Sequence, residues 1–207
     1  HTLATRQQLA RDVHPLLATR GVPGTHDVPL ALETIAALSQ PGVVKIPRFD
    51  KAIDDRRPPS QWPEITGPVD VVILEGWCLS IPAQPASALQ APVNSLEAQE
   101  DADGLWRGYV NAQLEADYTR LYDRVDFLVM LKAPDFSKVF EWRQNQEDKL
   151  AASTGAGSSN RIMNPAQLRR FIQHYERITR HGLDVLPASA DVVFQLTGEQ
   201  TIAGCLK

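Results

Sequence analysis

One short loop gathers four polar side chains of different chemistry. Residues 20–27 read Arg-Gly-Val-Pro-Gly-Thr-His-Asp, so Arg20, Thr25, His26 and Asp27 supply a fixed cation, a hydroxyl, an imidazole and a carboxylate. The two glycines permit positive backbone φ angles or close approach of a ligand, and the proline stiffens the turn. Such a set can form a ligand-binding loop. The alternative is a surface turn in which Asp27 or Thr25 caps the following helix.

Further charged residues follow two predicted strands. Glu75 comes directly after residues 69–74, an apolar run that predicts a buried strand of a parallel sheet. Because ligands of such sheets lie beyond the carboxyl ends of the strands, Glu75 is a candidate for holding Mg²⁺. Asp50, Lys51 and Arg56 lie in the loop after the preceding strand and are expected at the same edge. The alternatives are a helix cap or loop ion pair for Glu75, and a solvated run of charges for the loop.

A third group lies in the helix predicted over residues 135–150. Arg143, Gln146 and Glu147 share one face, because they are spaced at i, i+3 and i+4. The planar guanidinium of Arg143 suits charge stabilisation on a transferred phosphoryl group. The alternative is an Arg143–Glu147 ion pair on a solvated helix face. The Gly- and Ser-rich residues 153–160 predict a flexible loop and favour a lid.

The elements that must position these side chains alternate between helices and short apolar strands. Helices are predicted over residues 2–19, 28–38, 94–103, 105–123, 135–150 and 165–186, and strands over 43–46, 69–74, 127–131 and 191–196. This alternation predicts an α/β fold, a doubly wound, mostly parallel sheet with flanking helices. At 207 residues, we expect a single domain over residues 1–207 with a substantial core.

Composition and charge exclude several classes of protein. The net charge of −4 argues against a nucleic-acid binder, although local basic groups can still bind small anions. No apolar run approaches ~20 residues, so no membrane span is predicted. Cys78 and Cys205 form no disulfide framework and suit a reducing compartment, so a cytoplasmic location is expected. Neither cysteine has a metal-ligand partner at the usual spacing.

An ordered set of short motifs resembles the D-glycerate 3-kinase family, P-loop small-molecule kinases allied to uridine kinase and pantothenate kinase. Besides residues 20–27, the set comprises Ile46-Pro-Arg-Phe-Asp-Lys51, Asp55-Arg56-x-Pro58-x-x-x-Trp62, Leu74-Glu-Gly-Trp77, Asn94-x-Leu-Glu97, Trp106-Arg107, Trp142-Arg143-x-x-Gln146-Glu147 and His174-Tyr-Glu-Arg177. Each motif is weak alone. Their order along nearly the whole chain makes the resemblance specific.

The resemblance implies phosphoryl transfer from ATP with Mg²⁺ to a hydroxyl of a small metabolite, with D-glycerate as the expected acceptor. It implies that Glu75 is the carboxylate on the metal side and Arg143 the lid arginine, which contacts the nucleotide together with Gln146. A glycerate carboxylate needs a cation, which Lys51, Arg20 or Arg56 can supply. The acceptor site is expected to comprise Arg20, Thr25, His26, Asp27, Asp50, Lys51 and Arg56.

The sequence departs from the family by lacking two of its motifs. The phosphate loop, Gly-x-x-x-x-Gly-Lys-Ser/Thr, is absent, since no glycine is followed by lysine, and so is the Asp-Asp-Phe-Tyr motif that supplies the catalytic base. We therefore expect the P-loop and first strand of the fold to be missing from this chain, and the 207 residues alone to have little or no kinase activity. Two alternatives stay open. One is an inactive binding module that keeps the acceptor pocket, and the other is a related kinase with a nucleoside or pantothenate-like acceptor.

Overall fold

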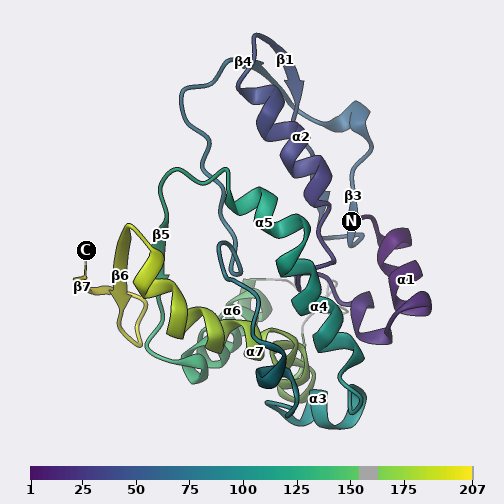
Figure 1. Cartoon of the computed structure of the whole chain (residues 1–207), viewed down its shortest axis with the longest axis vertical. Coiled ribbons are helices and arrows are strands. Elements are labelled where there is room, and N and C mark those ends of the chain that lie inside the picture. The colour runs from purple at the N-terminus through teal and green to yellow at the C-terminus, as the bar shows by residue number, and fades with distance from the viewer. Residues whose placement is uncertain (154–162, 207) are drawn as a thin grey trace. The chain divides into compact units, whose positions relative to one another are not determined.

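The computed structural model describes residues 1–153 and 163–206, which form two compact units. Unit 1 comprises His1–Pro85 and Asp103–Val125, and unit 2 comprises Ala86–Ala102 and Asp126–Lys207. Each unit therefore combines two separate stretches of the chain. Figure 1 labels most of the helices and strands of both. The expectation of a single domain over residues 1–207 stays a prediction.

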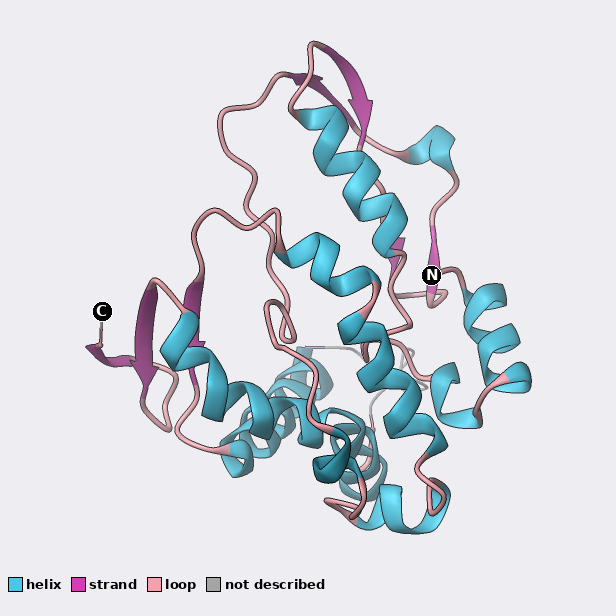
Figure 2. Ribbon diagram, viewed as in Figure 1, coloured by secondary structure: helices cyan, strands magenta, loops and turns pink. Residues whose placement is uncertain are grey.

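Unit 1 is mostly helical and has two small antiparallel sheets of two strands each (Figure 2). The strand β1 pairs with β4, and β2 pairs with β3. Its elements are α1 (Leu3–Asp12), η1 (Pro15–Ala18), α2 (Val28–Leu38), β1 (Gly42–Lys45), β2 (Phe49–Asp50), β3 (Asp55–Arg56), η2 (Pro59–Gln61), β4 (Glu64–Gly67), α4 (Leu105–Glu115) and α5 (Asp117–Tyr122), where η marks a 3₁₀ helix. Its core includes Leu16, Leu17, Val22, Val28, Trp106, Val110, Leu114 and Leu121.

Unit 2 contains the one three-stranded sheet among the described residues, in the order β5-β6-β7. The strands β5 and β6 are parallel and are joined through two helices, whereas β7 is antiparallel to β6. A parallel pair needs such a crossover, which is typical of α/β folds. The elements of unit 2 are η3 (Ala86–Leu89), α3 (Ser95–Glu100), β5 (Val129–Lys132), α6 (Phe136–Ser153), α7 (Pro165–Ser189), β6 (Val192–Leu196) and β7 (Ile202–Cys205).

The prediction of a buried strand over residues 69–74 is wrong. These residues have no regular secondary structure, and Val71 and Ile73 are 75% and 89% exposed. A buried parallel strand needs hydrogen-bonded neighbours and covered faces, and none of the described strands pairs with this segment. Instead, the Val69 N–H donates to the Leu38 carbonyl at 2.9 Å, which connects the segment to the end of α2.

Other predicted elements differ in their continuity or their partners. The helix predicted over residues 2–19 is interrupted at Val13 and His14, between α1 and the 3₁₀ helix η1. The helix predicted over residues 105–123 is divided into α4 and α5 at Ala116. The strand predicted over residues 43–46 pairs antiparallel with β4 instead of joining a parallel sheet. Of the flexible loop predicted over residues 153–160, Ser153 ends α6 and residues 154–160 lie outside the described residues.

In the described part of the chain, no helix combines the length and the apolar composition that a membrane span requires.

Candidate functional site

The loop of residues 20–27 is folded around Thr25. This side chain is buried, and its hydroxyl accepts from the Gly21 N–H at 2.8 Å and donates to the Val22 carbonyl at 2.7 Å. Gly21 and Gly24 have φ angles of 108° and 90°, a region that glycine tolerates and other residues avoid. The glycines are therefore required by the backbone, as expected. The hydroxyl of Thr25 is engaged inside the loop, and its contact with a substrate stays a prediction.

Asp27 ends this loop and has two partners. Its Oδ1 accepts from the Leu30 N–H at 3.3 Å, so Asp27 is the N-cap of α2, the structural alternative that the sequence left open. Its Oδ2 binds Arg56 Nη1 at 2.6 Å, and each side chain is 27% exposed. The guanidinium of Arg56 also lies 6.0 Å from the ring centroid of Trp62. Two predicted acceptor residues thus form one half-buried ion pair.

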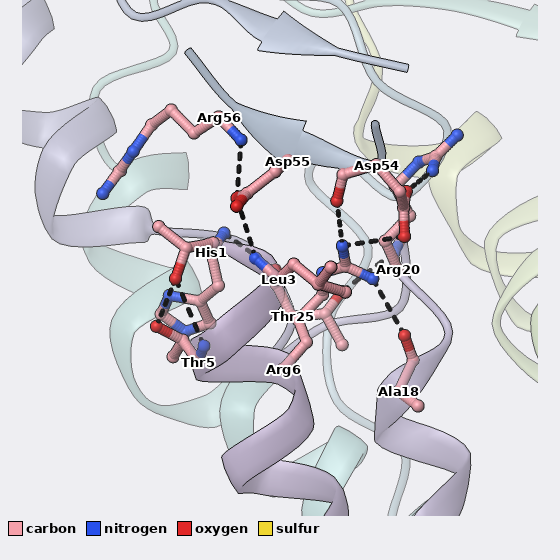
Figure 3. A network of polar contacts seen from close by, with 12 residues as sticks. His1, Leu3, Thr5, Arg6, Ala18, Arg20, Thr25, Asp54, Asp55 and Arg56 are labelled. Atoms are coloured by element: carbon pink, nitrogen blue, oxygen red, sulfur yellow. Dashed lines mark hydrogen bonds and ion pairs between the residues drawn. The ribbon is translucent and has the colours of Figure 1, made fainter. Parts of the chain in front are cut away.

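A buried arginine that sequence reasoning missed connects α1 to the β2–β3 hairpin (Figure 3). Arg6 is 1% exposed, and burial lowers its pKa. Its Nη1 donates to the Ala18 carbonyl at 2.9 Å, and its Nη2 donates to the carbonyl and the Oδ2 of Asp54 at 2.5 and 2.9 Å. Asp54 also pairs with Arg20, so one carboxylate binds two cations. The predicted acceptor residue Arg20 is thereby attached to the hairpin.

Asp55 holds the start of α1 (Figure 3). Its Oδ1 accepts from the Leu3 N–H at 2.8 Å and from the Arg56 N–H at 2.7 Å. These two hydrogen bonds lower the pKa of Asp55, and its negative charge suits a helix N-terminus. The Asp55-Arg56 motif therefore has two functions, since the first side chain holds α1 and the second binds Asp27.

The other acceptor candidates lie on or beside the same hairpin. The guanidinium of Arg20 is 5.3 Å from the ring centroid of Phe49 in β2. Asp50, also in β2, pairs with Arg57 Nη2 at 3.0 Å. Lys51 follows Asp50 in the turn of the hairpin and is exposed. The structure therefore brings Arg20, Asp50 and Lys51 to one hairpin, whose last residue carries the ion pair with Asp27.

His26 is held by Tyr118 of α5. Its Nδ1 lies 2.5 Å from the tyrosine Oη, and the ring centroids are 6.0 Å apart in an edge-on arrangement. The same oxygen accepts from the Gly24 N–H at 3.2 Å, and Tyr118 is buried. Desolvation lowers the pKa of His26 to about 4, so its imidazole is neutral near neutral pH. The residue as a whole remains exposed.

Glu75 does not follow a strand, so the reason for placing it at a sheet edge is wrong. It is exposed in an irregular segment. Two residues further on, the Trp77 Nε1–H donates to the Gly21 carbonyl at 2.8 Å, which connects this segment to the loop of residues 20–27. Among the described residues, no three His, Cys, Asp or Glu side chains are grouped to hold a metal ion. The metal role of Glu75 therefore stays a prediction.

Arg143 pairs within its own helix, α6, in unit 2. Its Nη2 binds Glu147 Oε1 at 2.6 Å and its Nη1 donates to Gln146 Oε1 at 2.8 Å. Glu147 is only 3% exposed, and its Oε2 accepts from the Met163 N–H at 3.2 Å. This ion pair is the structural alternative that the sequence left open. It differs from that alternative in one respect, because the Glu147 carboxylate is buried and does not lie on a solvated helix face. The roles of Arg143 and Gln146 at a nucleotide stay predictions, as does a common cleft with the residues of unit 1.

Two of the sequence motifs build a buried clamp in unit 2. Glu97 of α3 binds Arg177 of α7 through two bonds, at 2.8 Å to Nε and 2.6 Å to Nη2, and the side chains are 0% and 7% exposed. Arg177 also donates to the carbonyls of Ala88 and Ala91 at 2.7 Å each. The Asn94 side chain donates to a backbone carbonyl of α7 at 2.9 Å. These motifs hold the fold of unit 2.

The comparisons with known proteins agree with the motifs. No protein-family model matches the chain. The chain is 35% identical over 169 residues to "D-glycerate 3-kinase, chloroplastic" of Arabidopsis thaliana, a match that covers 78% of this chain and 34% of that protein. It is 31% identical over 184 residues to "Uncharacterized kinase mug58" of Schizosaccharomyces pombe, covering 84% of this chain and 63% of that protein. The chain thus spans less than two thirds of either relative.

A solved structure extends the similarity to the fold. The D-glycerate 3-kinase from Cryptococcus neoformans matches 99% of this chain and 75% of its own length with a TM-score of 0.78, at 26% sequence identity. This match confirms the predicted α/β class, and the relatives confirm the resemblance that the motifs indicate.

Proposed function

Because this chain is homologous to D-glycerate 3-kinases, we propose that the protein it comes from is an ATP-dependent kinase that phosphorylates a hydroxyl of D-glycerate. The kinase names of the relatives support a phosphotransferase, and a phosphotransferase of this kind takes its phosphoryl group from ATP. The 35% identity to a protein named D-glycerate 3-kinase supports the acceptor. These relatives do not favour a nucleoside or pantothenate-like acceptor, or an inactive binding module.

The Asp27–Arg56 pair is the observation that best supports a small hydroxy acid as the acceptor. A small hydroxy acid presents a carboxylate beside hydroxyl groups, so its site needs a cation and a hydrogen-bond acceptor close together. A guanidinium binds carboxylates through parallel N–H groups, and the structure assigns one N–H of Arg56 to Asp27. We therefore assign the acceptor carboxylate to Arg56 and a hydroxyl of the acceptor to Asp27, whose Oδ2 lies 2.6 Å from Nη1 of that cation.

The neighbouring hairpin adds charge of both signs. Arg20 and Lys51 are the further cations proposed for the acceptor carboxylate, and Asp50 is proposed as a hydrogen-bond acceptor. Arg20 is bound to Asp54 and lies over Phe49, so it is held in place before any ligand binds. Preorganised charges of this kind bind an anion with little loss of side-chain entropy.

On the phosphoryl side, Arg143 and Gln146 are proposed to contact the nucleotide phosphates. The side-chain contacts of Arg143 support this role, because Gln146 and the buried Glu147 hold its guanidinium in one orientation. Mg²⁺ is usually held by one or two carboxylates together with water and the phosphates of the nucleotide, and Glu75 is proposed as its carboxylate ligand. The proposal therefore comprises the acceptor residues, Arg143 with Gln146, and Glu75.

The proposed function is tested by assaying the full-length protein with ATP and a panel of acceptors. The panel contains D-glycerate, L-glycerate, a nucleoside and pantothenate, with ADP formation as the readout and the product identified by phosphorus NMR. D-glycerate is expected to have the highest kcat/KM. A preference for the nucleoside or pantothenate would contradict the acceptor, and transfer to none of them would support the inactive module.

Arg56→Gln in the full-length protein is expected to raise KM for D-glycerate by about 10- to 100-fold. A hydrogen bond to a charged group contributes about 1.5–3 kcal/mol, and 1.4 kcal/mol is a factor of ten. The matched control is Lys45→Gln, which removes the exposed Lys45–Glu64 pair elsewhere in unit 1. Steady-state kinetics should show a KM within about twofold of wild type for the control, since exposed pairs contribute little. Equal effects of both substitutions would remove Arg56 from the acceptor site.

A further inference from the structure

One buried hydroxyl on α5 contacts the loop of residues 20–27 at two points. The Oη of Tyr118 accepts from the Gly24 N–H at 3.2 Å and lies 2.5 Å from His26 Nδ1. Tyr118 is only 3% exposed, so its hydroxyl cannot exchange these partners for solvent freely. No local pattern connects this tyrosine with the loop, because the two are more than ninety residues apart in the chain.

These two contacts determine where the proton of His26 lies. A backbone N–H can only donate, so the Gly24 N–H uses a lone pair of the tyrosine oxygen. The single hydroxyl proton is then available to His26 Nδ1, the one acceptor assigned to it among the described residues. The opposite direction would leave a buried hydroxyl proton without an acceptor, which is unfavourable. A neutral imidazole that accepts at Nδ1 carries its proton at Nε2.

We infer that Tyr118 is a positioning residue of the acceptor site, which fixes His26 in the Nε2–H tautomer and so presents this N–H as a hydrogen-bond donor to the bound hydroxy acid. The identity of that ligand rests on the proposed function. His26 precedes Asp27 in the loop, so the donor belongs to the segment that carries the Asp27–Arg56 pair. A neutral donor beside this ion pair adds recognition of an oxygen without adding charge.

The packing around the loop supports a fixed geometry. A Cβ atom at Gly24 would lie 2.6 Å from Cε1 of Tyr109 and 2.9 Å from Cγ of Gln113, both on α4, so the loop backbone lies directly against that helix. Burial lowers the pKa of His26 to about 4. The hydroxyl of Tyr118 competes with a proton for the Nδ1 lone pair and so stabilises the neutral imidazole. Its loss in Tyr118→Phe removes this competition and adds no charge. The pKa of His26 in Tyr118→Phe should therefore move upward, toward its ordinary value of 6.5.

The test is Tyr118→Phe in the full-length protein, with two readouts. Nitrogen-15 NMR of the histidine rings is expected to show the Nε2–H tautomer for His26 in wild type. In the variant it should show a mixture of tautomers and titration at higher pH. Kinetics are expected to show a KM for D-glycerate raised about tenfold, with kcat and the KM for ATP within about twofold. His26→Gln should raise the same KM, and the double variant should be no worse than the single variants.

The matched control is Tyr122→Phe, on the same helix. Its hydroxyl donates to the Cys78 carbonyl at 2.7 Å, outside the loop of residues 20–27. It should lose similar stability but leave the KM for D-glycerate and the titration of His26 unchanged. An Nδ1–H tautomer in wild type, or an unchanged KM in Tyr118→Phe, would overturn the inference. If wild type phosphorylates no hydroxy acid, the proposed function and the ligand assigned to His26 both fail, and the NMR result alone decides the tautomer.

Discussion

Replacing Glu97 with glutamine is expected to lower the free energy of unfolding of the chain by about 3–5 kcal/mol, because it leaves one member of a buried ion pair uncompensated. Glu97 is 0% exposed and binds Arg177 through both carboxylate oxygens. Glutamine keeps the shape of the side chain but not its charge. The guanidinium of Arg177 would then stay buried with the amide oxygen of the glutamine and two backbone carbonyls as acceptors, but without a negative charge to compensate its own.

A neighbouring pair supplies the control for this prediction. Glu100 of α3 binds Arg170 of α7 at 2.6 and 2.9 Å, so it joins the same two helices, but the side chains are 41% and 52% exposed. Glu100→Gln should cost no more than about 1 kcal/mol, because water and salt screen exposed charges. Urea denaturation followed by circular dichroism gives both values, and hydrogen exchange in α3 and α7 locates the loss. Similar values for the two variants would show that burial of the Glu97 pair is unimportant.

Gly24→Ala is expected to destabilise unit 1 by roughly 2–4 kcal/mol and to impair acceptor binding. A left-handed backbone costs a residue with a Cβ about 1–2 kcal/mol, and overpacking a well-packed site costs about 1–3 kcal/mol. Gly24 has a φ of 90°, and its added methyl group would meet Tyr109 at 2.6 Å. Relief of this contact requires movement of the loop that carries His26 and Asp27.

The control lies on the helix that the loop packs against. Gly108 is within α4 and has no atom within 4 Å of an added Cβ, so Gly108→Ala should stabilise the chain by about 0.5–1 kcal/mol. Thermal unfolding of both variants, together with KM for D-glycerate in the full-length protein, checks the pair. If Gly24→Ala matched wild type in stability and in KM, the loop would have to be mobile enough to absorb a methyl group.

The sequence predicted helices better than strands, because helix signals are local. Asn164 and Pro165 mark the start of α7, and the structure shows a capping box between Asn164 and Gln167. Asp27 similarly marks the start of α2. The apolar residues 69–74 carried no local signal against a strand. A strand depends on partners far away in the chain, and none of the described segments pairs with these residues.

The candidate site was predicted as a set of residues but not as a set of contacts. Asp27 and Arg56 were both candidates, yet nothing in the spacing predicted that they form an ion pair across 29 positions. The β2–β3 hairpin that presents Arg56 has two residues in each strand, too few for a periodic pattern. Arg6 and Tyr118 were missed because an arginine in a surface helix and a tyrosine in an apolar helix face look ordinary until their partners are known.

The two contacts of the Asp27 carboxylate have a thermodynamic consequence. One carboxylate oxygen holds the first turn of α2, and the other holds Arg56. A ligand that draws Arg56 away changes how firmly that first turn is closed. By reciprocity, opening or closing of that first turn then changes ligand affinity by the same free energy with which the ligand shifts this equilibrium. Protection of the backbone amides from hydrogen exchange in the first turn of α2 thus reports whether the acceptor site is occupied. It can be measured without following turnover.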